Sequence, residues 1–164
     1  MQDLSIGTSA YEVVLALHIA GALVAFGSIF AFPIMFALAR RQDHRSLPLM
    51  HRIERMIERV LINGGLLIVV GAGAYLATAG KDWSRFFVDW GLGAAIVIGG
   101  LVGSVMIPAS RRAEAAVSRD VEKASEGELE LSDEYRRLAR RLTVTGLLCS
   151  ALVLATIFIM VLKP

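Results

Sequence analysis

Four long apolar runs, separated by charged segments, dominate the chain. They cover residues 13–39, 60–80, 87–109 and 142–162, and Asp89 is their only charged residue. A helix needs about 20 residues to cross the hydrocarbon layer of a membrane, and each run is long enough. The pattern therefore predicts an all-α fold, a four-helix transmembrane bundle with helices at about 11–40, 53–80, 85–108 and 133–162.

The chain is predicted to form a single transmembrane domain, residues 1–164. Its largest segment outside the membrane is a charged helical hairpin, 109–141, in which Ser132 is placed to cap the second arm. Gly99 and Gly103 have the GxxxG spacing that lets helices approach closely. We expect such small residues to pack within the bundle, in a homo-oligomer or against a partner in a membrane complex.

The basic residues predict the orientation of the bundle. All but three of the 17 Lys and Arg residues lie in the first and third connections, and the exceptions are Lys81, Arg85 and Lys163. Because cytoplasmic loops are rich in Lys and Arg, both connections should be cytoplasmic and both termini outside.

The same charges identify the expected partners. The basic residues flank helix ends, where anionic lipid head groups lie, so the lipid bilayer is the expected partner and nucleic acid is not. Arg far outnumbers Lys, and Ala and Gly are abundant, as in proteins from GC-rich bacterial genomes. We therefore expect a multi-pass protein of the bacterial inner (cytoplasmic) membrane.

His18 is the main candidate for chemistry, because an ionisable group inside a membrane is costly to hold. It lies in "ALHIAGALVAFG", with Gly21, Ala22 and Ala25 following on the same helix face. The space beside the ring would admit either a flat macrocycle or a neighbouring helix. His18 is thus either an axial metal ligand to haem iron or a neutral histidine bonded to a nearby carbonyl or hydroxyl.

Two further residues complete the predicted cofactor-binding set. Tyr75 and Met160 lie at the same expected depth as His18, in the outer third of the bundle, as do Asp89 and Thr156. Inward-facing side chains at this depth would share one site, and Met160 is a candidate second iron ligand. Asp89 is better explained as a solvated carboxylate at a helix N-terminus.

Other familiar site chemistry is missing from the sequence. Cys149 is the only cysteine, so there is no disulfide framework and no cysteine metal cluster. His44 and His51 fall in the Arg-rich first connection and are predicted to be solvated. The catalytic residues are unknown, and whether the protein is an enzyme stays open.

Three stretches of the sequence resemble known families. "LALHIAGALVAFGSIFAFPIMF", "LMHRIERMIERVLINGGLLIVVGAGAYLA" and "IFIMVLKP" resemble a bacterial family of predicted four-helix integral membrane proteins of unknown function. More distantly, His18, Phe26 and Gly27 resemble a first-helix pattern of the haem-containing four-helix protoporphyrinogen oxidase and of copper-resistance D membrane proteins. This resemblance implies that His18 binds haem b, although Phe26 stands where that oxidase commonly has tryptophan.

Two functions follow as alternatives. The first is a b-type haem or porphyrin-binding redox protein ligated through His18. The second is a non-catalytic membrane subunit or scaffold that acts through helix–helix contacts.

Overall fold

The computed structural model describes residues 9–42, 44–124 and 129–163, and these contain helices and no strand. The helices are α1 (Ala10–Gln42), η1 (His44–Ser46), α2 (Leu47–Ile57), η2 (Glu58–Ile62), α3 (Asn63–Gly80), α4 (Phe86–Leu101), η3 (Val102–Met106), α5 (Ile107–Lys123) and α6 (Asp133–Leu162). The short element η1 is a 3₁₀ helix, whereas η2 and η3 are π-helical turns inside longer helices.

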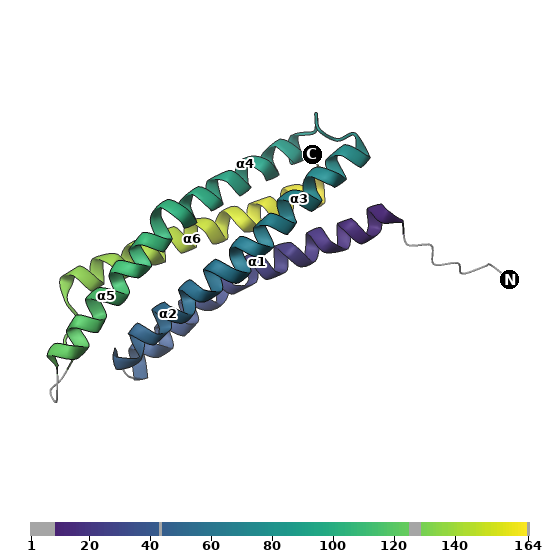
Figure 1. Ribbon diagram of the computed structural model, residues 1–164. Coiled ribbons are helices and arrows are strands. Elements are labelled where there is room, and N and C mark those ends of the chain that lie inside the picture. Colours follow the sequence, from purple (N-terminus) through teal and green to yellow (C-terminus); the bar gives the residue numbers. More distant parts are fainter. Residues whose placement is uncertain (1–8, 43, 125–128, 164) are drawn as a thin grey trace.

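These elements form four continuous rods, each long and apolar enough to cross a membrane. They are α1, the second rod α2–η2–α3, the third rod α4–η3–α5, and α6. The predicted all-α bundle with four membrane-spanning helices is confirmed. The start of α1 and the end of α6 lie at one end of the bundle, opposite the start of α2 and the end of α5 (Figure 1).

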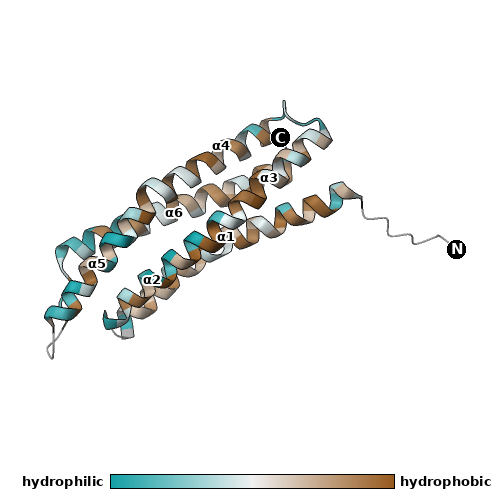
Figure 2. Ribbon diagram, in the orientation of Figure 1, coloured by the Kyte–Doolittle hydropathy of each residue, from teal (hydrophilic) through white to brown (hydrophobic). Residues whose placement is uncertain are grey.

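Hydropathy divides the bundle along its length. Hydrophilic residues gather over α2, α5 and the start of α6, while the other end is largely hydrophobic (Figure 2). Large apolar side chains such as Leu67 (76% exposed) and Val161 (74% exposed) point away from the protein in the hydrophobic part. Because these large apolar side chains are not buried in protein, their exposure is favourable only when lipid surrounds them. Which end faces the cytoplasm stays a prediction, and we call the hydrophilic part the Arg-rich end.

The rods pair into two hairpins that are joined at the Arg-rich end. α1 packs most extensively on α3, and α4 packs on α6, whereas α3 and α4 touch sparsely. At the Arg-rich end α5 contacts both α2 and α6. The main buried cluster extends from the hydrophobic part, at Ile98 and Val153, to this end, at Val117 and Tyr135. The charged segment after residue 108 therefore packs as part of the bundle.

The third rod runs beyond Pro108, where the sequence places the end of the helix. Proline lacks an N–H group and normally interrupts a helix. Here Pro108 follows the π turn η3, in the first turn of α5. Because a π turn pairs residues five apart, the missing N–H falls where the hydrogen-bond register already changes, and the rod continues.

The predicted cap of the last helix is confirmed. The Ser132 side chain accepts a hydrogen bond from the Tyr135 backbone N–H, at 3.3 Å. The Ser132 backbone N–H in turn donates to a carboxylate oxygen of Asp120, on α5, at 2.9 Å. These bonds fix the start of α6 against α5. Between α5 and α6, residues 129–132 are non-helical, and residues 125–128 lie outside the described residues.

Candidate functional site

The structure places His18 against α3. Its Nδ1 donates a hydrogen bond to the backbone carbonyl of Val69, at 2.9 Å, and the ring lies beside Gly73. On the same face of α1, Ala25 packs directly on Gly65, and a side chain added at Gly21 would meet Ile68. A helix thus fills the space that the small residues leave on this face, as in the second of the two alternatives for His18.

The other residues of the predicted cofactor set have different surroundings. Tyr75 is 45% exposed, Ala22 is half-buried, and the tip of Met160 covers Gly91 on α4. Thr156, one turn before Met160, accepts a hydrogen bond from Trp90 Nε1 at 3.1 Å. The contacts of His18 thus lie within the first hairpin, and those of Met160 and Thr156 lie within the second. The contacts of this set are those of helix packing, and haem binding by it stays a prediction.

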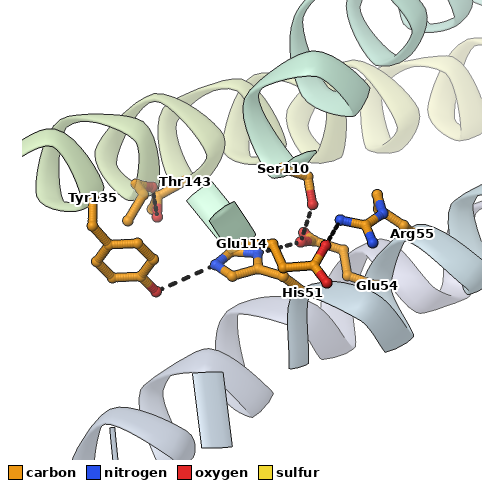
Figure 3. A network of polar contacts seen from close by, with 8 residues as sticks. His51, Glu54, Arg55, Ser110, Glu114, Tyr135 and Thr143 are labelled. Carbon is orange, nitrogen blue, oxygen red and sulfur yellow. Dashed lines mark hydrogen bonds and ion pairs between the residues drawn. The ribbon is translucent and has the colours of Figure 1, made fainter. Parts of the chain in front are cut away.

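His51 is buried, so the prediction that it is solvated is wrong. Its exposed fraction is 1% and that of Glu54, on the same face of α2, is 3%. His51 Nδ1 lies 3.1 Å from a carboxylate oxygen of Glu54, and Nε2 lies 3.3 Å from the hydroxyl of Tyr135 on α6. Ser110 on α5 donates to the same Glu54 oxygen at 3.0 Å (Figure 3). We call these four residues the polar cluster.

The polar cluster joins the two hairpins. With a neutral imidazole, His51 donates from Nδ1 to Glu54 and accepts at Nε2 from the Tyr135 hydroxyl. Buried polar groups are tolerated when hydrogen bonds satisfy them, and here those bonds run between α2, α5 and α6. These hydrogen bonds therefore satisfy the buried polar groups, and they also stabilise the contact between the hairpins.

Charged residues surround the polar cluster. Arg55 on α2 pairs with Glu114 on α5, and Arg52 approaches Glu114 at 3.6 Å. Glu58, one helical turn beyond Glu54, is 1% exposed, and neither of its carboxylate oxygens has a hydrogen-bond partner among the described residues. Glu58 begins the π turn η2, a kind of distortion that is common at functional sites.

A cavity of about 90 Å³ adjoins the polar cluster, between α1 and α6. Its polar lining is formed by His51, Glu54, Tyr135 and Thr143. Its apolar lining comes from α1, α6 and the π turn η3, and consists of Ile29, Phe32, Pro33, Phe36, Met106, Ala139, Leu142 and Gly146. At about 30 Å³ per water molecule, this volume corresponds to about three waters or a short alkyl segment.

One sequence signal could have revealed the polar cluster. His51, Glu54 and Glu58 follow the spacing of a single helix face, whereas Arg52, Arg55 and Arg59 follow another. When a helix face next to a membrane span carries His and Glu but no arginine, these residues are expected to be buried against another helix. The partners themselves, Ser110 and Tyr135, are far away in the sequence and carry no local signal.

The described residues contain no group of three His, Cys, Asp or Glu side chains arranged to hold a metal ion. A comparison with family models gives one clear result. Residues 12–164 match the model described as "Predicted integral membrane protein (DUF2269)", so the chain belongs to that family. Neither the curated proteins nor the solved structures yield a significant match. The predicted membership of an integral membrane family is thus confirmed, and the resemblance to haem proteins is not shown.

Proposed function

We propose that this integral membrane protein binds a narrow amphiphilic molecule in the cavity between α1 and α6. The observation that carries the proposal is the cavity lining, which is apolar on the walls and holds the buried side chains of His51, Glu54 and Tyr135 on one side. An alkyl segment matches the walls, and a hydroxyl or carbonyl group on the ligand matches the polar side chains. The proposal places the protein among binding proteins. It shares the absence of catalysis with the second alternative from the sequence, but it assigns binding of a ligand in place of helix–helix contacts.

The lining also indicates how a ligand enters. Pro33 and Thr143, which line the cavity from α1 and α6, are exposed on helices whose neighbouring apolar residues face lipid. A ligand dissolved in the bilayer therefore reaches the cavity sideways, between the two helices, without crossing an aqueous phase. This route favours a molecule that partitions into membranes.

A photo-crosslinking experiment tests the proposal. The purified protein is incubated with a neutral long-chain alcohol that carries a diazirine on its chain, irradiated, and digested to locate the label. We expect labelling of peptides that line the cavity, and its loss in Gly146→Leu. Gly146 lines the cavity and an added Cβ there meets no atom within 4 Å, so leucine fills the space without a backbone clash.

Gly93→Leu is the matched control. Gly93 lies on α4 and is exposed, and an added Cβ there also meets nothing within 4 Å. Labelling at the cavity that is unchanged in Gly146→Leu, or equally reduced in Gly93→Leu, would contradict the proposal.

Haem ligation by His18 is the second candidate. Metal-binding histidines commonly donate their other ring nitrogen to a carbonyl, and the bond from Nδ1 to Val69 leaves Nε2 available in this way. Contact of Gly21 and Ala25 with α3 weighs against it. Protein expressed with ample haem decides the matter: a Soret band that vanishes in His18→Ala supports this candidate, and a colourless protein removes it.

A further inference from the structure

A second hollow lies beside the cavity, along the outer side of α6. It has a volume of about 380 Å³ and shares Tyr135, Ala139 and Thr143 with the cavity between α1 and α6. The hollow is otherwise lined by Leu131, Arg136, Arg140 and Val144. The two spaces therefore adjoin across one face of α6, with arginines lining one of them and mainly apolar residues lining the other.

The two arginines of the hollow are available to bind an anion. Arg140 makes no ion pair or hydrogen bond within the described part of the chain, and Arg136 approaches only Asp133, at 4.0 Å, between two exposed side chains. Such an exposed pair contributes little and is easily exchanged for another anion. Arg136 and Arg140 are one helical turn apart, so both reach the same side of α6.

The spacing along α6 matches the layers of a bilayer. Arg140 lies just before the charge-free run that begins at Leu142, and Gly146 of the cavity is six residues further on, about 9 Å at 1.5 Å per residue. An anionic group at the arginines would thus lie at the head-group level, and a chain attached to it would reach the cavity.

We propose that Arg136 and Arg140 hold the phosphate of an anionic phospholipid whose acyl chain enters the cavity between α1 and α6. This inference rests on the proposed function and adds the class of the ligand. The narrow volume admits a short segment of an acyl chain, and the position of the arginines selects a lipid from the leaflet at the Arg-rich end. Zwitterionic lipids also carry a phosphate, but their ammonium group offsets its charge, so they bind more weakly.

The test compares two photo-crosslinkable lipids with the same diazirine-bearing acyl chain, phosphatidylglycerol and phosphatidylcholine. The full-length protein is reconstituted in vesicles with either probe, and label at the cavity peptides is quantified. We expect the unmodified protein to prefer phosphatidylglycerol by roughly 10- to 30-fold, the size expected from two arginines near a membrane surface. The double variant Arg136→Gln, Arg140→Gln loses this preference.

The double variant Arg137→Gln, Arg141→Gln is the matched control, because it removes the same charge from the same helix but from residues outside the hollow. It keeps the preference. All four arginines are exposed, so neither variant disturbs the core. An excess of inorganic phosphate leaves the labelling unchanged, and displacement of the label by phosphate would overturn the assignment to a lipid.

Failure of this inference and failure of the proposed function are distinguishable. If Arg136→Gln, Arg140→Gln keeps the lipid preference while Gly146→Leu still abolishes labelling, the cavity binds an amphiphile and the role of the arginines is refuted. If Gly146→Leu leaves the labelling by both lipids intact, the cavity is not the binding site and both proposals fall.

Discussion

Replacing Gly65 with alanine tests the closest approach between two helices of the bundle. A Cβ at Gly65 would lie 2.7 Å from the Cβ of Ala25 and 2.8 Å from its backbone nitrogen. Carbon atoms in good contact are about 3.5–4.0 Å apart, so α1 and α3 must separate by about 1 Å. No side-chain rotation relieves the contact, because the opposing atoms are backbone atoms and a Cβ.

The expected loss of stability follows from this geometry. Inserting a methyl group into a packed contact costs about 1–3 kcal/mol, and a clash with backbone belongs in the upper part of that range. At about 2–4 °C per kcal/mol for a chain of this length, Gly65→Ala lowers the unfolding midpoint by roughly 5–10 °C.

Cys149 supplies the assay. It is the only cysteine of the chain and its exposed fraction is 0%. A maleimide that fluoresces on reaction with a thiol therefore reports unfolding during a temperature ramp of the detergent-solubilised protein, without any added label site.

Gly64→Ala is the control, at the neighbouring position of α3. A Cβ at Gly64 meets nothing within 4 Å. Alanine is the better helix former by up to about 1 kcal/mol, so this variant keeps or raises the midpoint. Equal midpoints for Gly64→Ala and Gly65→Ala would refute the close packing of α1 on α3.

Two further predictions use the same thermal assay. Glu54→Met lowers the midpoint because His51 and Ser110 donate to the same Glu54 oxygen and methionine leaves these buried donors without an acceptor, at a cost of about 1–3 kcal/mol of stability. Glu58→Met, the same change on the same helix face, leaves the midpoint unchanged or raises it, because the Glu58 oxygens have no partner among the described residues. A larger loss from Glu58→Met than from Glu54→Met would contradict this reasoning. Gly73→Ala places a Cβ 3.1 Å from His18 Cε1 and weakens the bond to Val69, so it lowers the midpoint of the unmodified protein. In His18→Ala the same change is harmless, and equal effects in both backgrounds would show that the two residues do not interact.

The membrane-spanning architecture was predictable from the sequence because lipid imposes a strong and local requirement. Every backbone polar group must be satisfied within its own helix, so long charge-free runs translate directly into spans. Helix ends were less predictable. Proline on its own favours the end of a helix, but here a π turn precedes Pro108 and the rod continues to Lys123. The turn places Val102 and Met106 in the core, where both are buried, and no local sequence signal indicates it.

The two histidines show why the candidate site was only partly predictable. Depth singled out His18, since an ionisable group within lipid needs a partner, and Val69 supplies one through its carbonyl. Any helix offers carbonyls, so depth does not separate a packing role from a ligand role. His51 was missed because its neighbours in the sequence, Arg52 and Arg55, indicate solvent. It is buried against Phe36 and Tyr135, which come from two other helices.

The polar cluster is therefore the part of the molecule that was least predictable from the sequence. In the hydrophobic part, small residues and a single histidine are satisfied by contacts between adjacent helices. At the Arg-rich end, three buried polar side chains from α2 and α6 line a cavity whose other walls are apolar. Packing alone would favour filling such a space with apolar side chains, because an apolar core of matching shape is at least as stable as a buried polar network. The presence of buried polar groups beside an open space is the reason for placing ligand binding here.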